Sequence, residues 1–109
     1  MSYRIFFAPE AQADLLELYE FIADASSPER ALGYIERIEV WCKSLQTFPE
    51  RGKRRDDIRP GLRVMGFERR ISIAFRVESD EVTILRIFYT GREIERGFDK
   101  AETERLSNK

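Results

Sequence analysis

The side chains best suited to chemistry are ten cations, nine of them arginines, in the second half of the chain. Arginine guanidinium groups can clamp a phosphate and stabilise charge that develops in a transition state. They stay protonated, so they make poor general bases. A nuclease that activates a 2′-hydroxyl would need another base, for which Lys53, Tyr89 and Glu93 are the nearby candidates. The cations are Lys53, Arg54, Arg55, Arg59, Arg63, Arg69, Arg70, Arg76, Arg86 and Arg92.

The usual catalytic and metal-binding signatures are missing from the sequence. It has no histidine, one cysteine and no phosphate-cradling glycine loop, so Ser-His or Cys-His nucleophilic catalysis and a zinc site are disfavoured. Cys42 falls within a helical apolar stripe, which predicts a buried small hydrophobe rather than a reactive thiol. We therefore expect neither a metal nor a cofactor. The apolar runs are too short for a membrane span or a signal peptide, which indicates a cytoplasmic protein.

The net charge of −1 conceals an uneven distribution along the chain. Residues 1–50 hold four Lys/Arg and nine Asp/Glu, a net −5, whereas residues 51–76 hold nine and three, a net +6. Residues 77–109 hold six and eight, a net −2. One interpretation is a solvated surface of mixed sign. The other is a basic centre that meets a polyanion or an acidic partner, because clustered charge steers association.

The pattern of apolar residues predicts one α+β domain. An N-terminal strand precedes an antiparallel two-helix hairpin, and a three-stranded antiparallel meander then completes one sheet packed on the hairpin. Period-two alternation marks the strands, and apolar spacings of three and four mark the helices. The expected strands are Tyr3–Phe7, Leu62–Met65, Arg69–Val77 and Glu81–Phe88, the expected helices are Glu10–Asp24 and Pro28–Thr47, and residues 48–61 are expected to form a charged loop.

The last strand is apolar on both faces, which is typical of a central position in a sheet. Simple alternation places Val82, Ile84 and Phe88 on one face and Leu85 and Ile87 on the other. Arg86 interrupts this strand, and a charged residue there is seldom buried alone. We therefore expect an open sheet face or an acidic partner for Arg86. On the first helix, Asp14 is expected on the polar side.

A second apolar stripe, at a spacing of seven, accompanies the main seam of the second helix. It consists of Tyr34, Trp41 and Phe48, and Leu16 and Phe21 also lie off the main seam of the first helix. These side chains either complete the core under the following loop or line a groove for the helix of a partner. The sequence alone leaves both interpretations open.

Three stretches resemble the RelE/ParE superfamily of bacterial type II toxins, and most closely its ParE branch. They are YRIFFAPEAQAD at residues 3–14, LQTFPERGKRRDDIRPGLR at residues 45–63, and residues 71–76 followed by VTILRIFYTGRE at residues 82–93. The P-x-x-G-x-x-R-D-D-[IL]-x-P-G-L-R pattern within the second stretch is fairly specific. The resemblance covers residues 3 to 93 and implies a single toxin domain over residues 1–98, followed by a polar tail over residues 99–109.

This resemblance implies a toxin that inhibits DNA gyrase by protein–protein binding and so blocks replication. A ParD-like antitoxin would neutralise it by wrapping a segment over the helical hairpin. The implied antitoxin contacts are Leu16, Tyr19, Tyr34, Ile38 and Trp41. The implied target contacts are Arg54, Arg55, Arg63, Arg86 and Arg92, and direct contact with nucleic acid is left open.

The RelE branch provides an alternative, a ribosome-dependent mRNA endoribonuclease. Arg63 and Arg86 match the sheet arginines of that branch, and Lys53 loosely matches a loop lysine. Tyr89 lies too early for a close match to the branch's C-terminal tyrosine, so the acid–base set is incomplete. A third interpretation is a basic binding domain without toxicity.

Overall fold

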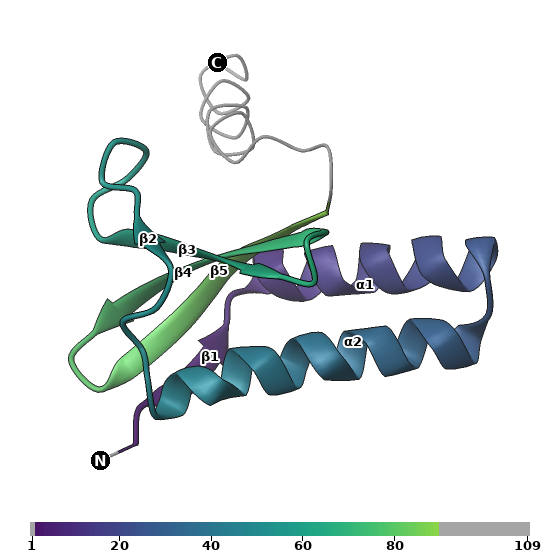
Figure 1. The fold of residues 1–109 in the computed structure, drawn as a ribbon, viewed down its shortest axis with the longest axis horizontal. Helices are drawn as coiled ribbons and strands as arrows, with labels where there is room; N and C mark the ends of the chain where they lie inside the picture. Colours follow the sequence, from purple (N-terminus) through teal and green to yellow (C-terminus); the bar gives the residue numbers. More distant parts are fainter. Residues whose placement is uncertain (1, 90–109) are drawn as a thin grey trace.

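The structure, a computed structural model, describes residues 2–89 and has two layers (Figure 1). A helical hairpin covers one face of a five-stranded sheet, as expected for an α+β domain. The predicted domain boundary at residue 98, and the candidate residues Arg92 and Glu93, lie outside the described residues. The elements are β1 (Arg4–Phe7), α1 (Pro9–Ala25), α2 (Pro28–Lys43), the 3₁₀ helix η1 (Ser44–Gln46), β2 (Lys53–Arg54), β3 (Leu62–Phe67), β4 (Ile71–Glu78) and β5 (Glu81–Tyr89).

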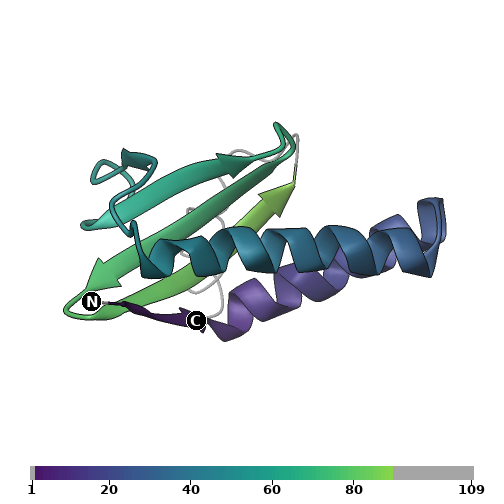
Figure 2. The same ribbon diagram turned by 60° about the horizontal axis from the view of Figure 1, so that its bottom comes forward.

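The sheet has the strand order β1-β5-β4-β3-β2. β1 pairs parallel to β5, and the other neighbours are antiparallel, so the expected meander of β3, β4 and β5 is confirmed. β5 is an interior strand between β1 and β4, as its two apolar faces predicted, although β1 pairs only with its first half. β1 and β2 form opposite edges of the sheet, as Figure 2 shows.

β2 is a fifth strand that the sequence analysis placed within a charged loop. It is only two residues long, Lys53 and Arg54, and both are exposed, so no apolar alternation marks it. Gly52 makes the pairing possible because its φ is +71° and a Cβ there would lie 2.1 Å from the carbonyl oxygen of Val64. The backbone of this glycine therefore packs directly on β3.

Replacing Gly52 with alanine should destabilise the protein by about 2 kcal/mol or more. Alanine would have to adopt a left-handed backbone conformation, and its Cβ would also overlap the backbone of Val64. Urea unfolding followed by circular dichroism measures this loss. Gly33→Ala is the matched control, because nothing lies within 4 Å of the added methyl group in α2. The control should gain up to about 1 kcal/mol. Equal stability of the two variants would contradict the close packing of Gly52.

Local sequence explains the ends of both helices. Pro9 and Pro28 occupy first turns, and the Ser27 side chain caps α2 by accepting a hydrogen bond from the Arg30 backbone N–H at 3.2 Å. The second α-helix ends at Lys43 rather than at Thr47, because its last turn tightens into η1 before Pro49. In the described part of the chain, no helix combines the length and apolar composition needed to cross a membrane.

The main core lies between the hairpin and the sheet. Ala11, Ile38, Cys42, Ile73 and Phe75 are fully buried in it, together with Val82, Ile84 and their neighbours. A smaller cluster of Leu62, Ala74 and Phe88 lies on the other face of the sheet and is covered in part by Ile58 from the loop before β3. Alternation along β4, with Ile73 in one cluster and Ala74 in the other, places the two clusters on opposite faces.

A β-bulge in β5 corrects the predicted alternation of that strand. Phe75 pairs with Ile84 and Ala74 pairs with Arg86, so Leu85 is the extra residue. As a result Ile87 joins the main core and Phe88 joins the smaller cluster, the reverse of simple alternation. The bulge cannot be seen in the sequence because every residue near it is compatible with a strand.

The two turns of the meander differ in how well they were predicted. The hairpin between β4 and β5 is confirmed, with Glu78 paired to Glu81 across Ser79 and Asp80. β4 begins at Ile71 and not at Arg69, because Glu68 and Arg69 adopt positive φ values of 48° and 64° in the preceding turn. Neither is a glycine or an asparagine, so no residue type in this stretch marks the turn.

Candidate functional site

Arg86 is held in a partly buried ion pair with Asp14 of α1. Its Nε lies 2.8 Å from Asp14 Oδ2, and its Nη2 lies 3.1 Å from Oδ1. The hydrogen bond to Asp14 raises the pKa of Arg86. The expected acidic partner of Arg86 is thus present, whereas the placement of Asp14 on a polar helix face is wrong, since this residue is only 7 % exposed.

Asp14 also completes the edge of β5. β1 pairs with β5 only as far as Ile84, so the later backbone of this edge has no neighbouring strand in the described part of the chain. The Ile87 N–H donates to Asp14 Oδ2 at 2.8 Å, so the helix supplies the acceptor that a strand would otherwise provide. Arg86 therefore has a structural role, because its guanidinium is already paired with Asp14.

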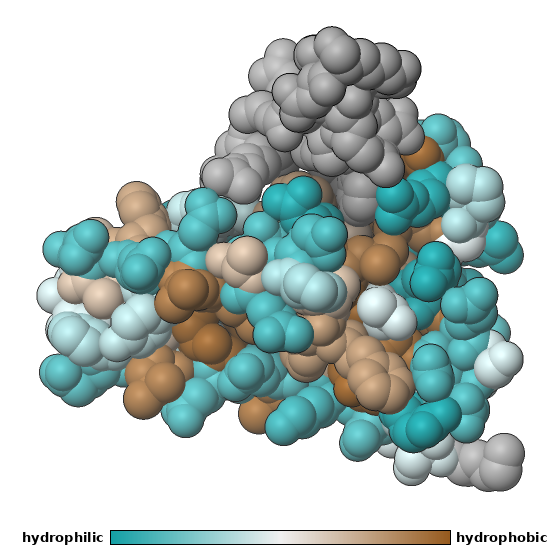
Figure 3. Space-filling view, turned by 180° about the vertical axis from the view of Figure 1, so that it is seen from behind, coloured by the Kyte–Doolittle hydropathy of each residue, from teal (hydrophilic) through white to brown (hydrophobic). Residues whose placement is uncertain are grey.

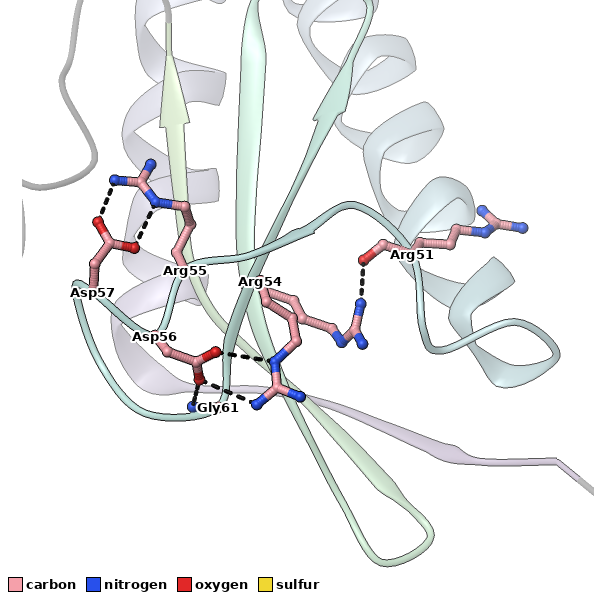
Figure 4. A network of polar contacts seen from close by, with 7 residues as sticks. Arg51, Arg54, Arg55, Asp56, Asp57 and Gly61 are labelled. Carbon is pink, nitrogen blue, oxygen red and sulfur yellow. Dashed lines mark hydrogen bonds and ion pairs between the residues drawn. The ribbon is translucent and has the colours of Figure 1, made fainter.

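The basic loop before β3 is braced by its own acidic residues (Figure 4). Arg54 forms a bidentate pair with Asp56 at 3.1 and 3.2 Å, and Arg55 forms one with Asp57 at 3.0 and 2.8 Å. The Gly61 N–H donates to Asp56 at 2.8 Å. This backbone hydrogen bond and Arg54 lower the pKa of Asp56, and Arg55 lowers that of Asp57. The pairs hold the guanidinium groups in place while reducing the net positive charge of the loop.

Arg63 and Arg51 connect the loop to the end of the second helix. Arg63 donates to the Arg51 carbonyl at 3.3 Å, and Arg51 donates to Ser44 Oγ at 2.8 Å. The Arg51 guanidinium also lies 5.1 Å from the ring centroid of Trp41 and 5.7 Å from that of Phe48. These cation–π contacts fix the path of the chain from η1 to β2.

The four residues of the ribonuclease alternative do not meet at one place. Tyr89 pairs with Ile71 while Arg63 pairs with Phe75, so about 13 Å of strand separates them along β4. Tyr89 packs against the main core and lies 5.7 Å from the Phe21 ring. Arg86 lies over Phe88 of the smaller cluster, at 5.0 Å. Lys53, the fourth residue, is on the edge strand β2.

A groove of about 620 Å³ runs beside β1 on the outer side of the hairpin. Leu16 and Tyr19 line it as expected, and Leu16 is 60 % exposed. β1 adds Phe6, which is 46 % exposed, and α2 adds Ile35. Apolar side chains gather over this face of the hairpin in Figure 3. Phe6 was not among the predicted contact residues, although its alternation with Ile5 and Phe7 in the expected strand could have indicated it.

The other three predicted antitoxin contacts lie elsewhere. Tyr34 and Trp41 face the opposite side of α2, each with its ring centroid 6.1 Å from that of Phe67. Both aromatics thus contact Phe67 of β3, but Trp41 remains 37% exposed and Phe48 62% exposed, so the two interpretations of this stripe both stay open. Ile38 is fully buried in the main core, so its prediction as a surface contact is wrong.

The described residues contain no cluster of three or more histidine, cysteine, aspartate or glutamate side chains that could hold a metal ion. Cys42 is fully buried, as predicted. Its burial raises the pKa of the thiol to about 12. This cysteine is therefore a packing residue and not a nucleophile.

Comparison with known proteins identifies the fold and the family. The family described as "ParE toxin of type II toxin-antitoxin system, parDE" matches residues 5–94. Toxin ParE3 of Caulobacter vibrioides is 31% identical over 74 residues, which is 68% of this chain and 73% of that protein. A chain of the chromosomal ParDE system of P. aeruginosa is 32% identical, with a TM-score of 0.71 over 81% of this chain and 96% of that one.

A chain of the RelBE2 toxin–antitoxin complex of Mycobacterium tuberculosis shares the fold at 19% identity, with a TM-score of 0.59 over 82% of this chain and 99% of that one. The protein has a helical hairpin packed on an antiparallel meander, with a parallel N-terminal strand at one edge of the sheet. This fold places it among the RelE/ParE type toxins. Within that class, the chain belongs to the ParE toxin family of type II toxin–antitoxin systems.

Proposed function

We propose that this protein inhibits DNA gyrase by direct protein–protein binding, and that it thereby blocks replication and arrests growth in the cytoplasm. The family match over residues 5–94 carries the proposal, because gyrase inhibition is what membership of the ParE branch implies. The geometry agrees with a binding mechanism. Arg63, Arg86 and Tyr89 do not converge, and Asp14 engages Arg86, so the arrangement favours binding over acid–base catalysis on RNA.

A ParD-like antitoxin neutralises the toxin in this proposal by docking on the groove beside β1. Leu16, Tyr19 and Phe6 form an apolar surface that is partly exposed to solvent in the free protein. An amphipathic helix that lays its apolar side into such a groove is a recurrent form of recognition. The two structural neighbours come from toxin–antitoxin systems, which supports an antitoxin as the occupant.

The basic loop is the proposed contact surface for gyrase. Arg54 and Arg55 extend from it with a fixed geometry set by Asp56 and Asp57. β2 begins this loop at one edge of the sheet, and β1 forms the other edge beside the antitoxin groove. Two partners can therefore recognise different surfaces.

Expression without antitoxin tests the proposed target in cells. A reporter of the SOS response should be induced, because a poisoned gyrase leaves damaged DNA, and cellular mRNA should keep its full length. Growth arrest with intact DNA and shortened mRNA would instead support the ribonuclease alternative.

Reversing the charge of the loop, with Arg54→Glu and Arg55→Glu, should weaken toxicity and gyrase binding by about tenfold or more. Antitoxin affinity should change by less than about threefold, because the groove lies at the other edge of the sheet. Surface plasmon resonance with each partner measures both. The control reverses two charges outside the loop, with Lys43→Glu and Arg69→Glu, at exposed residues that line neither the groove nor the loop. Equal loss of both affinities in the loop variant would argue against separate surfaces.

A further inference from the structure

A second cleft, of about 500 Å³, lies at the other end of the hairpin, between the α1–α2 turn and the turn that joins β3 to β4. Its charge differs from that of the groove beside β1. Among residues 2–89, Arg30, Arg37 and Arg70 line it with a single carboxylate, Glu68, whereas Glu39 is the only charged residue lining the groove. The cleft is thus a positive site beside two helices that belong to residues 1–50, a stretch with a net charge of −5.

Tyr34 gives the cleft an unused hydrogen-bonding group. Its hydroxyl is buried and has no hydrogen-bond partner among the described residues. Burial, followed by the nearby Glu68, raises the pKa of this tyrosine, so the hydroxyl keeps its proton and is available as a donor. A buried hydroxyl without a partner is unfavourable, and an acceptor brought by a ligand would remove that penalty.

The side chains over Tyr34 can exchange partners. The Arg37 guanidinium lies 5.0 Å from the Tyr34 ring centroid and donates to Glu68 at 3.1 and 3.3 Å. The Arg37 and Glu68 side chains are 55% and 45% exposed, and such surface pairs contribute little to stability. An incoming carboxylate can therefore replace Glu68 on Arg37, next to the Tyr34 ring.

We propose that this cleft receives an acidic segment of the antitoxin, with one carboxylate bound by the arginines and the Tyr34 hydroxyl. The cleft has both donors and an acceptor, Glu68, together with the apolar wall of Ile22 and the ring of Tyr89, a combination that suits a peptide. A nucleic acid would carry further phosphates onto the acidic helices around the cleft, where like charges repel. The proposal rests on the proposed antitoxin binding and adds a second, charged contact to the apolar groove.

Tyr34→Phe separates a binding role of the hydroxyl from a structural one. It should raise the melting temperature of the free toxin by about 2–5 °C, because an unpaired buried hydroxyl is removed. It should weaken binding of the purified antitoxin encoded beside the toxin gene by about five- to tenfold in calorimetric titration. A stabilised toxin with unchanged antitoxin affinity would overturn the proposal.

Arg70→Ala tests whether the bound antitoxin segment is acidic. Arg69→Ala is the control, because Arg69 lies on the same turn but does not line the cleft. Arg70→Ala should lower antitoxin affinity by about tenfold and make it less dependent on salt, whereas Arg69→Ala should do neither. Equal effects of the two variants would overturn the proposal.

Two further outcomes have distinct meanings. If the wild-type toxin does not bind the antitoxin, both the proposed antitoxin function and this inference fail. If the antitoxin binds wild-type toxin and the Tyr34 and Arg70 variants equally, only this inference fails. A change in the amide signals of residues 90–109 of the free Arg70→Ala protein, independent of concentration, would assign the cleft to the chain's own C-terminal segment and would also overturn the inference.

Discussion

Asp14→Ala should reduce the free energy of unfolding by about 3–5 kcal/mol, the largest stability loss that we expect from any polar substitution in this protein. The change leaves the partly buried Arg86 without its carboxylate and removes the acceptor of the Ile87 N–H. Both losses occur where α1 covers the unpaired edge of β5. Urea unfolding monitored by tryptophan fluorescence measures the effect.

Two variants distinguish the buried pair from ordinary surface ion pairs. Arg4→Ala removes pairs with Asp80 and Glu81, but the Arg4 side chain is 63% exposed, so a loss below about 1 kcal/mol is expected. Asp14→Leu combined with Arg86→Met should recover part of the stability lost in Asp14→Ala, because no charge remains unpaired. A loss in Asp14→Ala no larger than that in Arg4→Ala would contradict the structural role of this pair.

Leu16→Glu should weaken antitoxin binding by about thirtyfold or more, since it places a charge in the apolar groove beside β1. The folded toxin should keep its stability within about 0.5 kcal/mol, because this side chain is 60% exposed and glutamate is a good helix former. Toxicity in cells that also express the antitoxin should therefore increase. Titration calorimetry of the purified pair measures the change in affinity.

Leu32→Glu is the matched control for the groove. Leu32 is also an exposed leucine of the hairpin, at 53%, but it does not line the groove. Its substitution should leave antitoxin affinity nearly unchanged. If both leucine variants lost affinity equally, the antitoxin would cover the hairpin broadly, and the groove would not be the specific docking site.

The sequence was sufficient for the architecture because its apolar periodicity is strong. The spacing of Ala31, Ile35, Ile38 and Cys42 defined the buried side of α2, and the two apolar faces of β5 marked it as central. The two-residue strand β2 and the bulge at Leu85 were missed because neither depends on hydrophobic pattern. Both arise from pairing with strands distant in sequence.

The candidate site was less predictable because it depends on which side chains meet in space. Arg86 was expected to have either an open sheet face or an acidic partner, and the structure shows the partner. Asp14 could not be identified as that partner, since 72 positions separate them. A spacing of seven correctly aligned Tyr34 and Trp41 on one side of α2, yet periodicity could not show that Phe67 would cover that side. The cleft around Tyr34 combines residues from both helices, the β3–β4 turn and the end of β5, and no local motif encodes it.

We propose that this ParE family protein acts on gyrase and that its antitoxin prevents this action. The most direct test combines the purified toxin with gyrase and plasmid DNA, with and without antitoxin, and measures supercoiling and trapped linear DNA. We expect lost supercoiling or accumulated linear DNA, and recovery when antitoxin is added. Full supercoiling at a large molar excess of toxin would contradict the claim and would shift attention to ribosomes and mRNA.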